Sequence, residues 1–158
     1  MTVNDRIGDV VLEVKDLQTY FVTRWGIVKA VDGVSFNLRK GETLGIVGES
    51  GSGKSVTTLS MMRMVPSPPC HIVGGEVILE GENILELDEK EMEKVRGSRI
   101  AMVLQDPMTA LNPVFDIENQ VGEALKIHER LKGDGLRNTV VDMLRKVRIP
   151  APDIRMKD

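Results

Sequence analysis

The first third of the chain alternates apolar and polar residues at the short spacing of β-strands. Valine and phenylalanine recur among polar residues between positions 10 and 36, interrupted by Gly26 and Gly33. Because successive side chains of a strand point to opposite faces, the alternation predicts antiparallel strands. A second alternating stretch, residues 75–84, predicts another exposed strand pair.

Two further segments are apolar without alternation. They are residues 43–48 (TLGIVG) and residues 99–105 (RIAMVLQ). A strand that is covered on both faces of a sheet has no polar side, so its residues form a continuous apolar run. We therefore expect both segments to be buried strands, the second of them followed by a turn-rich stretch with Pro107 and Pro113.

Helical signals mark the second half of the chain. Residues 88–96 begin with a capping pair, Asp88 and Glu91, and predict a short surface helix. Apolar residues at helical spacing then predict two amphipathic helices, one over residues 117–131 and one over residues 136–147.

The composition fits a globular domain of ordinary size. The 158 residues predict one hydrophobic core, and a net charge of -3 gives no sign of a nucleic-acid binder held by charge. One cysteine and two histidines supply neither a disulfide nor the ligands of structural zinc. No apolar run approaches the roughly 20 residues of a membrane-spanning helix. The acidic start lacks the features of a secretory signal, so we expect a soluble protein of a reducing compartment.

The sequence GESGSGKS, residues 48–55, carries the strongest indication of function. It matches the phosphate-loop pattern Gly-x-x-x-x-Gly-Lys-[Ser/Thr], and it stands between an expected strand and an expected helix, residues 55–65. Glycines at positions 48, 51 and 53 let the backbone curl, so that successive N–H groups can point at phosphate oxygens. The alternative is a flexible turn without a ligand, which this context disfavours.

This chemistry calls for a nucleoside triphosphate with magnesium. The amino group of Lys54 would reach the β- and γ-phosphates, and the hydroxyl of Ser55 would be a ligand of Mg²⁺. Two other phosphate-loop classes are less well supported. A GTPase would need an Asn-Lys-x-Asp motif, which is absent, and a nucleoside kinase rarely places about 40 residues of strand pattern before its loop.

Four longer strings resemble one family, the ATP-binding subunits of ABC transporters, and within it the oligopeptide and dipeptide importer ATPases. The strings are LEVKDLQTYF, KAVDGVSFNLRKGETLGIVGESGSGKS, GGEVILEGENIL and RGSRIAMVLQDPMTALNPVF. The last is the most specific, because it looks like the peptide-importer version of the Q-loop. The resemblance covers nearly the whole chain and implies an α/β phosphate-loop NTPase fold. In this fold an ABC-type nucleotide-binding domain carries an N-terminal antiparallel β subdomain.

The resemblance also implies how this partial domain, residues 1–158, is divided. The expected parts are an antiparallel β part (residues 1–42 and 75–87), a phosphate-loop core (43–66 and 99–105) and the start of a helical subdomain (106–150).

The family's functional positions carry over where this chain matches its motifs. Gln105 matches the Q-loop glutamine, which in this family approaches Mg²⁺ and the attacking water, so the resemblance makes it a catalytic and metal-site residue. Gln105 also ends an expected buried strand, and in open α/β sheets ligands bind outside the carboxyl ends of the strands. The alternative is a glutamine in a solvated turn. The resemblance assigns ATP binding to the phosphate loop, namely Gly48, Glu49, Ser50, Gly51, Ser52, Gly53, Lys54, Ser55 and Val56.

Phe21 matches the aromatic residue that stacks on adenine in this family. Tyr20 and Trp25 are close enough in sequence to take that role instead. A plain core cluster at a strand end is a third interpretation.

The stretch after Gln105 matches the region where the family's helical subdomain meets the coupling helices of the membrane subunits. Met108, Leu111, Val114 and Phe115 would then form an apolar docking patch. The ordinary alternative is that these residues fold inward as core.

Several motifs of the family have no counterpart downstream of Gln105. They are the signature sequence, the Walker B strand with its catalytic glutamate, the D-loop and the switch histidine. Without the general base and the carboxylate that holds Mg²⁺, this chain is not expected to hydrolyse ATP alone. The resemblance also implies that strands from the absent part pack beside residues 43–47 and 100–104, so we expect unpaired edges and marginal stability.

These observations predict the N-terminal part of a peptide-importer ATPase at the cytoplasmic face of the cell membrane. It would bind Mg-ATP, couple it to permease transmembrane subunits and act with a second ATP-binding subunit. The main alternative is a catalytically inactive nucleotide-binding or interaction fragment. A third, an ABC-type ATPase of DNA repair, is disfavoured by the near-neutral charge and the string QDPMTALNP, and no nucleic-acid partner is expected.

Overall fold

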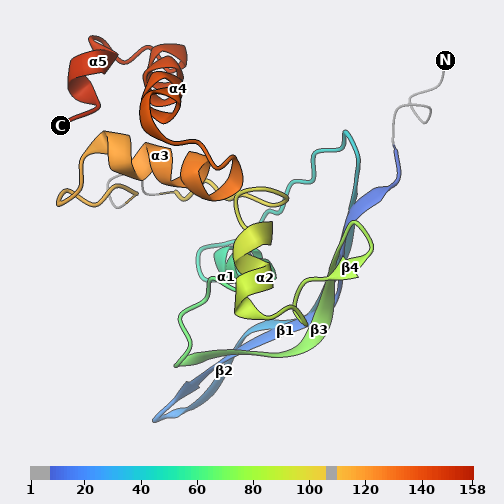
Figure 1. The fold of residues 1–158 in the computed structure, drawn as a ribbon. Helices are drawn as coiled ribbons and strands as arrows, with labels where there is room; N and C mark the ends of the chain where they lie inside the picture. Colours follow the sequence, from blue (N-terminus) through green and yellow to red (C-terminus); the bar gives the residue numbers. More distant parts are fainter. Residues whose placement is uncertain (1–7, 106–109) are drawn as a thin grey trace. The chain divides into compact units, whose positions relative to one another are not determined.

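The contacts of the chain divide it into two compact units, Met1–Met92 and Glu93–Asp158. The structure, a computed structural model, describes residues 8–105 and 110–158, and Figure 1 shows its elements in chain order. Each unit buries apolar residues of its own, although the length of the chain predicted a single core. None of the described helices is long and apolar enough to cross a bilayer.

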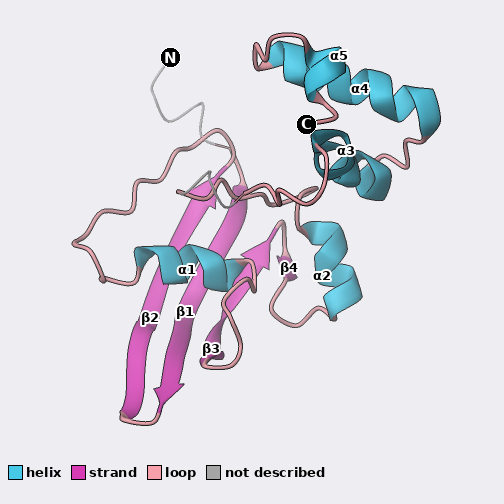
Figure 2. Ribbon diagram, turned by 90° about the vertical axis from the view of Figure 1, so that its left-hand side faces the viewer, coloured by secondary structure: helices cyan, strands magenta, loops and turns pink. Residues whose placement is uncertain are grey.

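A four-stranded antiparallel sheet forms the first unit (Figure 2). β1 (Val10–Thr23) and β2 (Gly26–Arg39) make the long hairpin that the alternating pattern predicted. β3 (Cys70–Leu79) pairs with the other side of β1, and the two-residue β4 (Glu82–Asn83) completes the order β2-β1-β3-β4. The predicted strand pair at residues 75–84 is therefore confirmed, and its first strand begins earlier than expected.

The ladder between β1 and β2 contains an irregularity at Ala30. Thr19 pairs with Val31 and the next residue, Tyr20, pairs with Lys29, so Ala30 has no opposite residue in β1. An extra residue of this kind bends its strand and turns its carbonyl group out of the ladder. This bulge lies where the hairpin meets the phosphate loop.

The helix α1 (Lys54–Met61) lies across one face of the sheet (Figure 2). A buried hydrogen bond joins the two layers, because the hydroxyl of Thr19 in β1 donates to Oγ of Ser60 at 2.8 Å. Ser60 in turn donates to the carbonyl oxygen of Val56 at 2.6 Å. The predicted helix over residues 55–65 is confirmed in its first two turns and ends four residues early.

The two segments predicted to be buried strands are not strands. Residues 43–47 and 101–104 belong to no sheet of the described chain, and only an isolated bridge joins Arg96 to Ile100. Val47 is 93% exposed and Val103 is 99% exposed. A strand that is apolar on both sides needs hydrogen-bonding neighbours and a cover on each face. The described residues provide neither, and most residues of the two segments are exposed.

The short surface helix is confirmed as α2 (Glu89–Val95). Its start is a reciprocal capping box: the backbone N–H of Glu91 donates to the carboxylate of Asp88 at 2.8 Å, and the N–H of Asp88 donates to the carboxylate of Glu91 at 3.0 Å. Each carboxylate satisfies a backbone donor that the helix itself leaves without a partner.

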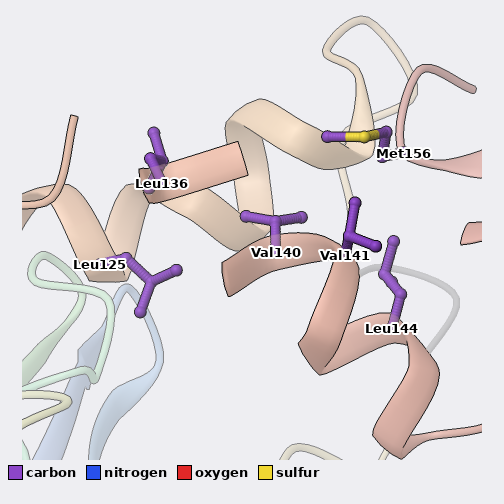
Figure 3. Close-up of a cluster of buried hydrophobic side chains, with 6 residues drawn as sticks. All are labelled: Leu125, Leu136, Val140, Val141, Leu144 and Met156. Carbon is purple, nitrogen blue, oxygen red and sulfur yellow. The ribbon is translucent and has the colours of Figure 1, made fainter. Parts of the chain in front are cut away.

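Helices build the second unit. α3 (Ile117–His128) and α4 (Gly133–Lys146) are the two predicted amphipathic helices, and α5 (Pro152–Arg155) follows them. The sequence did not predict α5, because a helix of four residues is too short to show a period. Figure 3 shows the core that these helices share, which consists of Leu125, Leu136, Val140, Val141, Leu144 and Met156.

Candidate functional site

The phosphate loop leads directly into the N-terminus of α1. Gly53 is the residue before the helix, and no side chain caps the helix there. Among the described residues, the backbone N–H groups of Gly51, Gly53, Lys54, Ser55 and Val56 donate no hydrogen bond. The first turn of the helix also contains no acidic residue. An anion at this point would meet uncommitted N–H donors and the positive end of the helix dipole.

The side chain of Lys54 folds back over the loop. Its ammonium donates to the carbonyl oxygens of Gly48 at 2.7 Å and Glu49 at 2.6 Å, and to Oγ of Ser52 at 3.2 Å. The residue is half-buried. The loop therefore holds a positive charge in its interior by its own oxygens, and an incoming phosphate would meet that charge already in place.

Two of the loop glycines are required by their backbone conformation. Gly51 has φ 82° and Gly53 has φ 90°, both in the left-handed region that other residues enter at a cost. Gly53 also packs against the bulge of β2, because a Cβ atom on it would lie 2.3 Å from the carbonyl oxygen of Ala30. The curl of the loop thus depends on the absence of a side chain at position 53.

The aromatic residues near the hairpin tip differ in the face of the sheet they occupy. Thr19 points to the face that α1 covers, since it bonds Ser60, and Phe21, two residues on, shares that face. Tyr20 points to the opposite face, where its hydroxyl donates to Asp32 at 2.6 Å. Of the three candidates for adenine stacking, Phe21 therefore lies on the same face as the helix of the phosphate loop, and Trp25 lies in the turn.

The donors around Ser55 fit a magnesium ion that is held largely by phosphate oxygens. Ser55 is exposed in the first turn of α1. Within residues 8–105 and 110–158, no cluster of three or more His, Cys, Asp or Glu side chains could form an all-protein metal site. Mg²⁺ bound to nucleotides characteristically takes one or two protein ligands and otherwise phosphate and water oxygens, so a single hydroxyl is a sufficient contribution here.

The predicted Q-loop residue Gln105 belongs to the second unit. It is exposed and follows residues 101–104, which belong to no strand of the described residues. The structure thus brings together the predicted residues of the phosphate loop and places Phe21 on the face of its helix. Gln105 is a residue of the other unit.

The predicted docking patch is largely exposed. Met108 lies outside the described residues, whereas Leu111, Val114 and Phe115 all have exposed side chains. These three residues are therefore not inward-facing core, which was the ordinary alternative.

A glutamine that sequence analysis did not single out holds this segment together. The side-chain amide of Gln120 donates to the carbonyl oxygens of Asn112 at 2.9 Å and Phe115 at 2.7 Å, and its oxygen accepts from the N–H of Asn112 at 2.7 Å. The role of Ala30, whose carbonyl oxygen lies against Gly53, was also missed, because no residue pattern assigns a contact to either Ala30 or Gln120.

The comparison with protein families decides the identity of this fold. The family model described as "ABC transporter" matches residues 31–152, which is most of the chain. This protein belongs to the ABC transporter family. The phosphate loop and the segment that contains Gln105 both lie inside the matched range.

Two curated relatives of this ABC protein are named as ATP-binding proteins of peptide transport. It is 48% identical over 151 residues to the probable peptide ABC transporter ATP-binding protein y4tR of Sinorhizobium fredii, covering 96% of this chain and 45% of the relative. It is also 48% identical over 145 residues to the oligopeptide transport ATP-binding protein OppD of Bacillus subtilis, covering 92% of this chain and 40% of that protein. The chain therefore spans less than half the length of these relatives.

Solved structures agree on the fold. The dimeric structure of MJ0796, a bacterial ABC transporter cassette, matches with a TM-score of 0.76 at 24% identity, over 92% of this chain and 61% of that one. A second structure of the same cassette, bound to ADP and Pi, matches with a TM-score of 0.74 at 22% identity. At these identities the match shows the ABC cassette fold and nothing finer.

Proposed function

We propose that this ABC protein binds Mg-ATP through residues 48–56 as the ATP-binding part of a peptide importer. One observation carries the proposal: the ammonium of Lys54 is held inside a loop whose neighbouring helix N-terminus has no side-chain cap. Uncapped N–H groups and a preplaced cation form a receptor for a polyphosphate chain. The names of the curated relatives, peptide and oligopeptide transport ATP-binding proteins, support the substrate class.

Each part of the loop has a role in this proposal. Gly48, Glu49, Ser50, Gly51, Ser52 and Gly53 form the curl whose uncommitted N–H groups point at phosphate oxygens, and Val56 adds the N–H of the first helical turn. The ammonium of Lys54 exchanges loop carbonyls for the β- and γ-phosphates, which are the stronger partners because they are charged. The hydroxyl of Ser55 would hold Mg²⁺, and the ion would supply positive charge that offsets the charge of the phosphates.

Phe21 is the residue that we assign to the adenine ring. It shares the α1 face of the sheet with Thr19, whereas the hydroxyl of Tyr20 is engaged with Asp32 on the other face. An aromatic ring stacked on a base contributes roughly 1–3 kcal/mol.

The second unit supplies coupling in this proposal. Gln105 takes the catalytic and metal-binding role that its Q-loop match implies, and the exposed side chains of Leu111, Val114 and Phe115 dock on the permease transmembrane subunits. The protein would work at the cytoplasmic face of the cell membrane together with a second ATP-binding subunit. The dimeric structure of the MJ0796 cassette supports that last expectation.

We propose further that this chain by itself binds ATP without turning it over. Its sequence downstream of Gln105 holds no Walker B glutamate and no signature motif, so the groups that would activate water and cap the γ-phosphate are not supplied by these 158 residues. The other candidate, an interaction fragment that binds no nucleotide, is disfavoured by the arrangement of Lys54.

Calorimetric titration with ATP in millimolar magnesium tests the proposal. We expect saturable binding by the native chain and at least tenfold weaker binding by Lys54→Ala. The control is Lys126→Ala, which removes an exposed lysine of α3 whose ammonium donates to the side-chain oxygen of Asn119, and it should bind as the native chain does. Binding that is absent, or equal in all three proteins, would contradict the proposal, and phosphate release that depends on Lys54 would contradict the expected lack of turnover.

A further inference from the structure

The turn that joins β1 to β2 is closed by hydrogen bonds and carries a largely exposed tryptophan. Oγ of Thr23 accepts the backbone N–H of Trp25 at 3.2 Å and donates to the carbonyl oxygen of Gly26 at 2.9 Å. These bonds close the turn and hold Trp25 outward, with 83% of the residue exposed. The guanidinium carbon of Arg24 lies 4.2 Å from the centroid of the indole ring. Such a pair is a preorganised amphipathic group with one cationic and one apolar part.

The hairpin tip behind this turn is apolar on both faces. Val22 pairs with Ile27, and these residues are 54% and 65% exposed on one face. The adjacent pair, Phe21 with Val28, points to the other face, where Val28 is 55% exposed. β3 pairs with β1 only as far as Phe21, so the tip extends past its sheet neighbour, as Figure 2 shows.

The end of the hairpin carries a net charge of opposite sign to that of the whole protein. Residues 17–31 contain two basic residues and no acidic one, whereas the whole protein has a net charge of -3. The ammonium of Lys29 is 3.2 Å from the carboxylate of Asp32, at the base of the tip. Arg24 is therefore the cation that stands beside the exposed apolar residues.

We propose that the tip of the β1–β2 hairpin, residues 22–28, inserts into the headgroup region of an anionic lipid bilayer. A flat protein partner covers one face of a hairpin, and would leave either Val28 or the pair Val22 and Ile27 in water. A lipid interface surrounds the tip and covers both faces. Tryptophan with a basic neighbour is the combination that the headgroup region favours.

The unpaired outer edge of β2 limits the depth of this insertion. β2 is an edge strand of the sheet, so part of its backbone has no strand partner within the described residues. Such groups can remain in the hydrated headgroup layer but are costly in the hydrocarbon core. The hairpin therefore anchors this unit at a membrane surface, which goes beyond its proposed attachment through permease subunits.

Trp25 is itself the reporter that tests this inference, because it is the only tryptophan of the chain. Its fluorescence is recorded during titration with vesicles of phosphatidylcholine alone and of phosphatidylcholine with phosphatidylglycerol. We expect a shift of the emission maximum to shorter wavelength with the anionic vesicles, and partitioning at least tenfold weaker with the neutral ones. An emission spectrum that no vesicle changes would overturn the proposal.

Two substitutions separate insertion from unspecific adsorption. Ile27→Asp should weaken partitioning at least tenfold, and Arg24→Glu should remove the preference for anionic vesicles. The matched control is Ile127→Asp, an equally exposed isoleucine of α3, which should partition as the native chain does. Equal losses in Ile27→Asp and Ile127→Asp would overturn the assignment to the tip. Trp25→Ala, followed by vesicle co-sedimentation, checks the result without fluorescence.

One further variant separates vesicle binding from nucleotide binding. Lys54→Ala should bind vesicles as the native chain does, so a failure of the ATP proposal leaves this one standing. A change of Trp25 emission on adding Mg-ATP, with none on adding vesicles, would assign the tip to the base of the nucleotide and overturn membrane insertion.

Discussion

Gly53 of the phosphate loop and Ala30 of β2 approach so closely that a Cβ atom on Gly53 would lie 2.3 Å from the carbonyl oxygen of Ala30. The carbonyl is available because Ala30 is the extra residue of a bulge, outside the ladder with β1. The hairpin therefore fixes the point at which the loop turns into α1. A change of the loop backbone at Gly53 would disturb the N–H groups that we assign to phosphate binding.

Gly53→Ala tests this contact against the matched variant Gly51→Ala. Both residues have positive φ, but a Cβ atom on Gly51 would meet no atom within 4 Å. Gly51→Ala should cost about 1–2 kcal/mol of unfolding free energy through backbone strain alone. Gly53→Ala should cost about 1–3 kcal/mol more, because the backbone must also move. Urea unfolding of the two variants measures the difference, and equal losses would contradict the account.

The buried hydrogen bond between Thr19 and Ser60 should couple the sheet to α1. A double-mutant cycle with Thr19→Val, Ser60→Ala and the combined variant isolates the bond from the loss of each group by itself. We expect a coupling free energy of about 0.5–1.5 kcal/mol, the usual contribution of a hydrogen bond. Strictly additive losses in urea unfolding would show that the two layers are held by apolar packing alone.

Tyr20 should titrate above the ordinary tyrosine pKa of 10.0. Its hydrogen bond to Asp32 is the main cause and desolvation adds to it, while Lys29 acts in the opposite direction; all three groups are at the surface. Because the folded-state pKa is raised, the stabilising contribution of this hydroxyl is complete below about pH 10 and is lost as the pH rises through the folded value.

Absorbance at 295 nm reports this titration directly, since Tyr20 is the only tyrosine. Asp32→Asn should lower the midpoint towards the ordinary value. The control Asp142→Asn, which removes one of the two acidic partners of Arg145 in α4, should leave the midpoint where it is. An unchanged midpoint in Asp32→Asn would show that the 2.6 Å bond does not persist in solution.

The exposed segment before α3 should mediate contact with permease subunits. Val114→Asp places a charge on a residue that is almost fully exposed, so it should leave folding intact and reduce co-purification with permease subunits several-fold. Val147→Asp alters a similarly exposed valine after α4 and serves as the control. Co-purification that is equal for both variants would place the contact elsewhere on the chain.

Sequence reasoning succeeded where a pattern depends on neighbours close in the chain. The β1–β2 hairpin, the capping box of Asp88 and Glu91 and the core face of α4 all follow from local spacing, because each is stabilised by residues within one element or its direct neighbour. The glycines of the phosphate loop were found for the same reason: their backbone angles are a local requirement.

The errors concern contacts that depend on distant partners. An apolar run such as residues 43–47 indicates only that a strand could be covered on both faces. The described residues supply no neighbouring strand with which it could pair. The approach of Ala30 to Gly53 depends on a bulge, and the ordering of residues 112–115 depends on one amide of Gln120. Neither feature has a periodicity or a motif that the sequence displays.

Backbone amide resonances of the loop offer the most direct measurement of the central claim, that uncommitted N–H groups and Lys54 receive a triphosphate. In ¹H–¹⁵N spectra recorded during titration with Mg-ATP, we expect large, saturable shifts for Gly51, Gly53, Lys54 and Ser55, and none for Val140 in α4. In Lys54→Ala the same additions should produce little change. Loop resonances that stay in place while the native chain is exposed to millimolar Mg-ATP would contradict the account.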